Sequence, residues 1–191
     1  MKKYLLDTNA FFELISFLVG KNIRNDGYNY EDIKKGKCYI SKMTELEINS
    51  VIGKYGRGEP AQWQKCSRLL SEDGTQQCNH DYFYKGQKPW KKKVCRDMMK
   101  LVKEILEGNS SLLKVNTLDV STAVMDKAKS FMLLSFKYKF GSHDAVIAAT
   151  AIENSTKENI MYVVTSDRAL RAAMKEEGVY FIVPGENDNK V

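Results

Sequence analysis

Three aspartates of this sequence occupy positions that suit the chemistry of metal ions and phosphates. Asp7 directly follows a short apolar run, Asp167 lies three residues after a second apolar run, and Asp144 opens a segment that is nearly all apolar. Carboxylates that converge in a partly buried site repel one another, and they stay ionised only if a cation offsets their charge. Carboxylate oxygens suit Mg²⁺ or Mn²⁺, and such an ion can acidify a bound water for attack on a phosphodiester.

A helix cap is the simpler explanation for each aspartate taken alone. An aspartate at the start of a helix most often accepts a backbone hydrogen bond and interacts favourably with the helix dipole. Asp7, Asp144 and Asp167 all precede or open segments with helical patterns. Three such acids in one chain of alternating strands and helices are less readily explained as unrelated caps, so we favour a shared site.

The segments that carry these acids alternate between strand and helix patterns. Apolar runs predict strands at about 4–6, 37–41, 112–115, 160–164 and 178–184. Apolar stripes predict helices at about 11–18, 30–35, 43–55, 94–106, 120–134, 144–152 and 168–175, with a loop at about 20–30 and a frayed tail to residue 191. The alternation predicts an α/β fold with a mainly parallel sheet, in which ligands lie beyond the carboxyl ends of the strands.

The bulk properties describe a globular chain with a modest excess of positive charge. Its 191 residues suffice for one domain with its own core, and the net charge of +6, with an isoelectric point near 9.0, suits a polyanionic partner. No apolar run approaches the roughly 20 residues that a membrane helix needs, and the N-terminus has no signal-peptide pattern. We therefore expect a cytoplasmic protein whose four cysteines are reduced or metal-bound.

Four short motifs follow one another along the chain. They are Leu5-Leu6-Asp7-Thr8-Asn9, the stretch from Ser41 to Glu47, the stretch from His143 to Ala151, and Val164-Thr165-Ser166-Asp167. In this order they resemble the PIN domain family, of the kind found in VapC-type toxin ribonucleases. The resemblance implies a single PIN-like domain over residues 1–191, with a three-layer α/β/α architecture, a mainly parallel central sheet and a helical or loop insertion at about 56–93.

The resemblance also implies an activity. Proteins of this kind are metal-dependent endoribonucleases, in which an activated water attacks an RNA phosphodiester in line and leaves a 5′-phosphate. The positions that match the family's four acids, which would hold one or two Mg²⁺ or Mn²⁺ ions, are Asp7, Glu47, Asp144 and Asp167. The family's supporting polar residues fall at Thr8, Asn9 and Thr165. A toxin of this kind further implies a cognate antitoxin as partner, and a homodimer.

One acid and the biological role stay open at this stage. Glu45 and Glu47 lie two positions apart, so on a helix only one of them can face the aspartates. The four-residue spacing of Glu47 from Met43 and Val51 favours Glu47, and Glu45 is the alternative. A non-catalytic nucleic-acid-binding PIN domain and an RNA-processing nuclease that is not a toxin also fit. Haloacid dehalogenase phosphatases begin similarly, but their pattern needs an acid where this chain has Asn9.

The insertion at about 56–93 differs in character from the rest of the chain. Trp63, Leu69 and Leu70 predict a short helix within it. Three thiols and one imidazole could form a tetrahedral zinc set, although their spacing matches no common zinc finger; they are Cys66, Cys78, His80 and Cys95. The alternative is that the cysteines at 66 and 95 are small buried residues on helices, as we expect for Cys38 in its strand.

A basic segment lies at the end of the insertion. Trp90 is followed directly by Lys91, Lys92 and Lys93. Cations beside an aromatic ring can contact a nucleic-acid backbone while the ring stacks on a base. These four residues therefore form a hypothetical RNA-binding segment, and the alternative is a solvated basic start of a helix.

Overall fold

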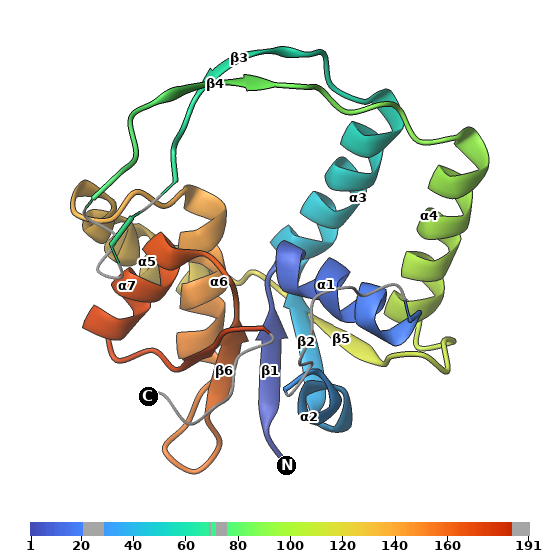
Figure 1. The fold of residues 1–191 in the computed structure, drawn as a ribbon. Helices are drawn as coiled ribbons and strands as arrows, with labels where there is room; N and C mark the ends of the chain where they lie inside the picture. Colours follow the sequence, from blue (N-terminus) through green and yellow to red (C-terminus); the bar gives the residue numbers. More distant parts are fainter. Residues whose placement is uncertain (21–28, 69, 72–75, 185–191) are drawn as a thin grey trace.

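The computed structural model describes residues 1–20, 29–68, 70–71 and 76–184. These residues form a five-stranded sheet with helices on both faces and a separate two-stranded hairpin (Figure 1). The strands of the main sheet are β1 (Lys3–Leu6), β2 (Lys37–Ser41), β5 (Val115–Leu118), β6 (Met161–Val164) and β7 (Phe181–Ile182), and those of the hairpin are β3 (Gln62–Lys65) and β4 (Asp81–Tyr84). The helices are α1 (Thr8–Leu18), α2 (Tyr30–Lys35), α3 (Lys42–Arg57), α4 (Lys92–Leu106), α5 (Thr122–Phe131), the 3₁₀ helix η1 (Met132–Phe136), α6 (Ser142–Glu153) and α7 (Arg168–Glu176).

The strands of the main sheet are all parallel, in the order β5-β2-β1-β6-β7. The strand β1 lies in the centre, where Leu6 is in register with Val164 of β6. Parallel neighbours require crossover connections, and helices of this chain supply them. The prediction of a mainly parallel α/β sheet is confirmed, and the carboxyl ends of its strands meet at one edge.

Alternate residues of the strands face two separate hydrophobic layers. In β1, Tyr4 and Leu6 pack into the layer that contains α1, α2, α3 and α4, whereas Leu5 packs into the layer that contains α5, α6 and α7. Each of these three side chains is at most 2% exposed. A strand that is buried on both faces needs apolar residues throughout, which explains the bare apolar run. The result is a three-layer α/β/α arrangement (Figure 1).

The helix α6 is deeply packed within the layer that contains α5, α6 and α7. Its residues from Ala145 to Ala151 are all buried, as its almost uniformly apolar sequence predicts. The four alanines of this helix leave room for close approach, and α6 packs on both α5 and β6. Because Asp144 lies in the first turn of α6, this packing gives that aspartate a rigid support.

Two strands differ from their predicted bounds. The third strand of the main sheet begins at Val115 and not at Leu112. Leu113 is buried, and the backbone N–H of Leu112 donates to Ser110 Oγ at 3.1 Å, so this apolar pair packs in a turn before the strand. The last strand is limited to Phe181–Ile182. The helix predicted to reach residue 134 ends as α5 at Phe131 and continues as η1.

The described residues of the insertion form a β-hairpin, and the short helix predicted from Trp63, Leu69 and Leu70 is not found among them. Trp63 lies in β3 opposite Phe83 of β4, with the ring centroids 5.6 Å apart in an edge-to-face arrangement. Leu69 is outside the described residues. Aromatic residues favour paired strands, and β4 is a run of three aromatics after Asp81. This cross-strand pairing outweighs the weak helical spacing of the apolar residues.

The hairpin belongs to an arm, which we define as residues 59–87 because Glu59 and Gln87 pair at its base. Their two backbone hydrogen bonds are 2.9 and 2.8 Å long. Next to this base, Trp90 stacks on Tyr55 of α3, with the ring centroids 4.7 Å apart. The arm extends from α3 and α4 across to the side of the molecule that holds α5 and α7 (Figure 1). There Lys139 donates a hydrogen bond to Gln77.

Some predicted features lie outside the described residues, namely most of the loop at 20–30 and the tail from residue 185. Among the helices of the described part, none has the length and apolar character needed to cross a membrane.

The base of the arm yields a first prediction, because Gly58 ends α3 with φ of +72° and ψ of −176°. This region of backbone conformation is essentially restricted to glycine, and an added Cβ would lie 2.5 Å from the carbonyl oxygen of Gln87. We expect Gly58→Ala to lower the free energy of unfolding by about 2 kcal/mol or more and to increase proteolytic cleavage within the arm. Chemical denaturation and limited proteolysis measure the two effects.

The matched control is Gly108→Ala. Gly108 has the same φ of +72°, but an added Cβ would meet nothing within 4 Å. This variant should therefore lose only the roughly 1 kcal/mol of left-handed strain and should leave the arm as resistant as in the wild type. Equal behaviour of the two variants would contradict a tightly packed arm base.

Candidate active site

The carboxyl edge of the sheet brings together two aspartates that are 160 positions apart in the sequence. Asp7 follows β1, and its backbone N–H donates to the carbonyl oxygen of Val164 at 3.1 Å, which extends the pairing of β1 with β6. Asp167 follows the end of β6 and precedes α7. The parallel register of the two central strands therefore places both acids at the same edge.

Three aspartates of this edge each accept a hydrogen bond from a backbone N–H at the start of a helix. The bonds are Ala10 N–H to Asp7 Oδ1 (2.6 Å) at α1, Gly141 N–H to Asp144 Oδ2 (2.8 Å) at α6, and Leu170 N–H to Asp167 Oδ1 (2.8 Å) at α7. The capping role considered from the sequence is thus real. Each of these backbone bonds engages one carboxylate oxygen, and Asp7 also accepts a hydrogen bond from the Thr165 side chain.

Glu47, and not Glu45, is the glutamate that joins this edge. The hydroxyl of Thr8 donates to Glu47 Oε2 at 2.6 Å, which ties α3 to the first turn of α1. Glu45 lies on the other side of α3, with its Oε2 3.8 Å from Lys42 Nζ. The neighbours of Glu47 in the sequence explain this orientation, because Ile48 is buried in the layer between α3 and the sheet.

Burial dominates the electrostatics of Asp7. Loss of solvent raises the pKa of its carboxyl group from 3.8 to about 6. Hydrogen bonds from Ala10 N–H and from the Thr165 side chain act in the opposite direction, and the nearby charges of Glu13 and Asp144 raise the pKa further. The ionised form of Asp7 is therefore less favoured than that of an exposed aspartate, and a nearby cation would stabilise it.

Asp144 is electrostatically linked to the other acids. Its pKa is raised, first by partial burial and then by the negative charges of Asp167 and Glu47, while the hydrogen bond from Gly141 lowers it. Since Asp144 also acts on Asp7, all four acids belong to one repelling cluster. In the described part of the chain, no three of these carboxylates have ligand atoms that all lie within 4.8 Å of one another.

Two of the three predicted supporting residues contact the acids directly. Thr165 is fully buried; its side chain bonds to Asp7, and its Oγ1 accepts the backbone N–H of Asp167 at 3.0 Å. Thr8 is also buried and holds Glu47, as described above. Asn9 is exposed and lines a cavity that Asp167 also lines.

Glu13 is a further acid near the site that the sequence analysis did not identify. It lies on α1, its charge raises the pKa of Asp7, and partial burial raises its own pKa. The hydroxyl of Tyr30 donates to Glu13 Oε2 at 3.3 Å. The signal in the sequence was the position of Glu13 as the only charged residue of a mostly apolar stretch that begins at Phe11, since a buried charge there needs a partner.

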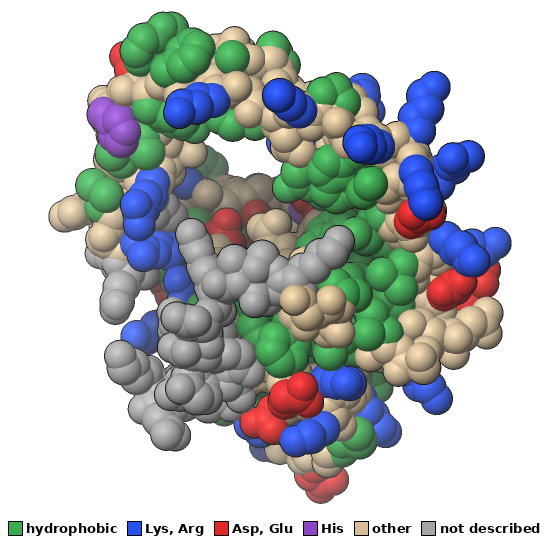
Figure 2. Space-filling view, turned by 45° about the vertical axis from the view of Figure 1, so that its right-hand side comes forward, with side chains coloured by type: hydrophobic (Ala, Val, Ile, Leu, Met, Phe, Trp, Pro, Cys, Tyr) green, Lys and Arg blue, Asp and Glu red, His purple; other side chains and the backbone are tan. Residues whose placement is uncertain are grey.

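A cavity of about 730 Å³ adjoins Asp167, and residues of the arm form part of its lining. Its lining residues come from the edge of the sheet, from the far part of the arm and from the segment between η1 and α6. They are Asn9, Ser67, Arg68, Gln77, Lys139, Ser166, Asp167, Arg168 and Ala169. Figure 2 shows an opening beneath the arm, with acidic side chains visible inside it and basic side chains along the arm. The arm thus forms one wall of the approach to the site.

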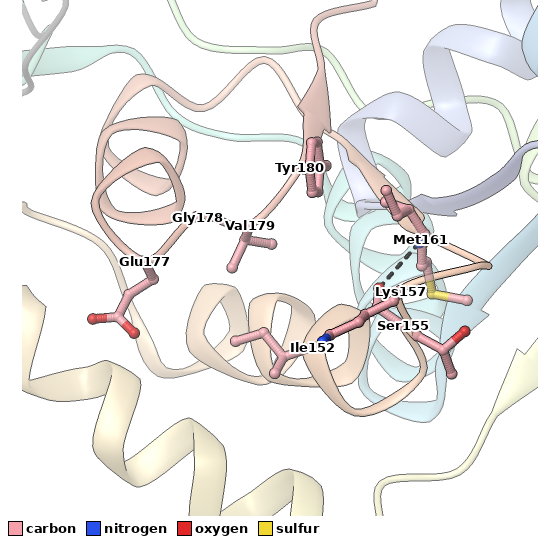
Figure 3. A pocket seen from close by; sticks show the side chains of 10 residues that line it. Ile152, Ser155, Lys157, Met161, Glu177, Gly178, Val179 and Tyr180 are labelled. Carbon is pink, nitrogen blue, oxygen red and sulfur yellow. Dashed lines mark hydrogen bonds between the residues drawn. The ribbon is translucent and has the colours of Figure 1, made fainter.

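A second cavity, of about 400 Å³, lies away from the acids. Ile152, Lys157, Glu177 and Tyr180 are among its lining residues (Figure 3). It is next to Met161, where β6 begins, whereas the acids lie where β6 ends. This cavity therefore plays no part in the site.

The predicted zinc residues separate into a group of three and one residue elsewhere. The ligand atoms of Cys66, Cys78 and His80 all lie within 4.8 Å of one another in the arm. Cys95 lies on α4, next to Gly56 of α3, and packs against the hydrophobic layer there. Hydrogen bonds from His80, first through its backbone, lower the pKa of the Cys78 thiol. Cys38 is buried in the core, and burial raises its pKa to about 12.

The hypothetical RNA-binding segment is also divided. Lys91, Lys92 and Lys93 are exposed at the start of α4. The face of Trp90 is covered by its stacking on Tyr55, and its backbone N–H donates to the carbonyl oxygen of Tyr55 at 2.9 Å. In this arrangement Trp90 anchors the arm and does not offer that face to a base.

The raised pKa of Asp7 predicts how stability depends on pH. Between pH 3.8 and about 6 the folded chain retains a proton that the unfolded chain has lost, so this group makes the free energy of unfolding fall as pH rises through that window. Asp7→Asn keeps a helix-capping side chain without the charge. We expect this variant to be more stable than the wild type by about 1–3 kcal/mol above pH 6, and equally stable below pH 3.8. Denaturation in a chelating buffer tests this.

Asp126→Asn serves as the control for the pH series. Asp126 is exposed and pairs only with Lys129 on the same helix, at 2.8 Å, so its removal should change stability little at any pH. A stability difference between Asp7→Asn and the wild type that stays constant across the window would contradict the buried, raised-pKa carboxyl group.

Comparisons with known proteins yield matches among solved structures. No protein-family model and no curated protein matches the sequence. The crystal structure of FitAcB from Neisseria gonorrhoeae is similar with a TM-score of 0.55 and 16% identity, over 96% of this chain and 99% of that chain. VapBC2 from Rickettsia felis, bound to a DNA fragment from its promoter, gives 0.51 and 16% over 94% and 97%. DNA-bound VapBC from Salmonella typhimurium gives 0.50 and 18% over 96% and 98%. At these identities the similarity is one of fold, and it spans nearly the whole chain.

Proposed function

We propose that this protein is a PIN-like, metal-dependent endoribonuclease that hydrolyses RNA phosphodiester bonds. The observation that carries the proposal is that four carboxylates from distant parts of the sequence gather at the carboxyl edge of the sheet. They belong to Asp7, Glu47, Asp144 and Asp167. The presence of Glu47 in this cluster favours a nuclease over a non-catalytic binding domain, because the acid set is then complete. Ligands of parallel α/β sheets bind at this edge.

The donor set fits Mg²⁺ or Mn²⁺. All donors are carboxylate oxygens, which hard divalent cations prefer, and the disfavoured charge of buried Asp7 is the kind that a bound cation stabilises. Asp7, Glu47, Asp144 and Asp167 would hold the ion or ions. When bound, such an ion supplies an acidified water and offsets negative charge at a phosphate.

The supporting contacts define what the chain itself contributes. Thr165 holds Asp7 and Asp167 in one arrangement by bonding to both. Thr8 orients Glu47, so that α3 and α1 cannot shift independently of each other at this edge. One oxygen of each of the three aspartates accepts a hydrogen bond from a backbone N–H at the start of a helix. The aspartates are therefore oriented before any substrate arrives.

The surroundings of the site support a polyanionic substrate. Arg68, Lys139 and Arg168 line the cavity beside Asp167, and cations so placed can contact phosphates on either side of a cleaved bond. Lys91, Lys92 and Lys93 lie at the start of α4, where the helix dipole disfavours positive charge. Helix stability therefore does not account for these lysines, whereas binding of an RNA backbone would.

A toxin of a toxin–antitoxin pair is the biological role that we propose for this nuclease. FitAcB and two VapBC complexes, one from Rickettsia felis and one from Salmonella typhimurium, are among the structures with a similar fold. The acid cluster favours the nuclease component of such a pair. A cognate antitoxin protein and a second copy of the chain are then the partners that we propose.

The nuclease proposal is tested with purified protein and a generic RNA mixture. We expect cleavage that requires Mg²⁺ or Mn²⁺ and that falls by at least about 100-fold in Asp7→Asn and Asp144→Asn, because each loses a carboxylate from the cluster. Expression of the wild type should also arrest growth, with rescue by the product of an adjacent gene, and the two variants should be harmless. Growth without arrest, combined with cleavage in vitro, would instead indicate an RNA-processing nuclease.

The two glutamates of α3 provide a matched pair for this assay. Glu47→Gln should abolish cleavage, whereas Glu45→Gln should retain it, since Glu45 faces Lys42 and not the aspartates. Calorimetry with Mn²⁺ should show the same contrast. If the wild type neither binds metal nor cleaves RNA, the chain is a non-catalytic binding domain.

The lysines of α4 yield a separate prediction about binding. Replacing Lys91, Lys92 and Lys93 by glutamine should weaken binding of a cleavage-deficient variant to single-stranded RNA and reduce the salt slope by about 2–3. Filter binding at several salt concentrations measures both quantities. The control replaces Lys100, Lys103 and Lys114 by glutamine, which removes the same charge from exposed positions further along the chain. A specific contact would be contradicted if the first set of substitutions left binding unchanged, or if both sets weakened binding equally.

A further inference from the structure

One face of the arm carries three side chains that are typical ligands of soft metal ions. Cys66 follows β3, and its backbone N–H donates to the carbonyl oxygen of His80 at 2.8 Å. This bond continues the antiparallel register in which Lys65 lies opposite Asp81, so Cys66 lies opposite His80. Cys78 precedes His80 by two positions, in the segment that leads into β4.

The ligand atoms of these residues have already converged. Cys78 Sγ lies 2.8 Å from His80 Nδ1, and the donor atoms of all three residues lie within 4.8 Å of one another. Within the described part of the chain, no other set of three histidine, cysteine, aspartate or glutamate side chains meets this limit. The two cysteines are free thiols and are partly buried, which leaves an ion access from solvent.

We propose that Cys66, Cys78 and His80 bind Zn²⁺ and that the ion fastens the two strands of the arm to each other. Two thiolates and one imidazole match the ligand preference of zinc, and a water or another small ligand would complete the tetrahedron. On binding, each thiol releases its proton to solvent, and no oxidation takes place. The proposal concerns a site distinct from the acid cluster, and it stands whether or not the protein is a nuclease.

The arm needs such a fastening because it has little apolar surface to bury. A hairpin of two strands is at best marginally stable by itself. The aromatic pair of its paired strands remains largely in solvent, since Trp63 is 71% exposed and Phe83 is 52% exposed. A metal ion bound across the two strands stabilises a small element where a hydrophobic core cannot.

The location of the three ligands connects the metal to the cavity beside the acids. Ser67 and Arg68 follow Cys66 directly, Gln77 precedes Cys78 directly, and all three of these neighbours line that cavity. A metal that fixes the two cysteines therefore also fixes the wall that the arm contributes. Without it, the far part of the arm is held to the body by fewer contacts, among them the hydrogen bond from Lys139 to Gln77.

The test measures zinc in the full-length protein purified in a reducing buffer without chelator. We expect about one equivalent of zinc per chain by elemental analysis, lost in Cys78→Ser and in His80→Ala. Titration of metal-free protein with Co²⁺ should produce the sulfur-to-cobalt charge-transfer band that only thiolate ligation gives. The acid cluster cannot produce this band, so Asp7→Asn and Asp144→Asn should retain it.

Cys95→Ser is the matched control, because Cys95 is partly buried like the two proposed ligands but lies on α4. It should retain both the zinc and the cobalt band. Absence of the band in the wild type, or its persistence in Cys78→Ser, would overturn the proposal. A disulfide between Cys66 and Cys78, found by mass spectrometry after lysis in an alkylating agent, would also overturn it.

A second measurement does not depend on how the variants fold. Limited proteolysis of the wild type, with and without added Zn²⁺, should show cleavage within residues 59–87 that the metal suppresses. Equal cleavage in the two conditions would show that zinc does not fasten the arm. Loss of nuclease activity plays no part in either readout, so failure of this proposal and failure of the nuclease proposal are distinguished.

Discussion

The burial of Asp7 is the constraint on which the candidate active site depends. Its carboxyl group lies at the end of the central strand, is 6% exposed, and has a pKa raised to about 6. A charge in this position lowers the stability of the fold, and the hydrogen bonds from Ala10 and Thr165 offset only part of that cost. Strongly perturbed groups that lie beside other acids in a cleft are characteristic of functional sites. The helix start at Ala10 and the side chain of Thr165 therefore stabilise a carboxylate charge that burial at the end of β1 makes unfavourable.

Helix capping and ligand binding are complementary roles in this site. Asp7, Asp144 and Asp167 each direct one oxygen to a backbone N–H at the start of a helix. The positive ends of three helix dipoles thus point towards the acids and reduce the cost of their mutual repulsion. The same bonds fix the rotation of each carboxylate, so that the second oxygens are oriented. When a helix starts directly after a buried strand, an acid at the junction lies at the carboxyl edge of the sheet, where acids from distant parts of the sequence meet.

The sequence predicted the sheet and the three aspartates because both depend on strong local patterns. Apolar runs that end abruptly at an acid define a buried strand and its carboxyl end in a few residues, as in Tyr4 to Asp7. The choice between Glu45 and Glu47 required the bond from Thr8, which is a contact between distant segments. The hairpin of the arm was missed because its pairing is between β3 and β4, which are separated by a long polar stretch. The strand β5 was misplaced because Leu113 is buried without being paired.

The two proposals assign two kinds of metal ion to two sets of ligands that differ in hardness. The edge of the sheet offers only oxygen donors, which favour Mg²⁺ or Mn²⁺, whereas the arm offers two sulfurs and an imidazole, which favour zinc. Because zinc binds most sites more tightly than magnesium does, a zinc ion in a carboxylate site would compete with the hard cation there. A sulfur-rich site a few residues from the cavity wall gives zinc a better alternative. The arm can then be stabilised by one metal while the acids remain free for another.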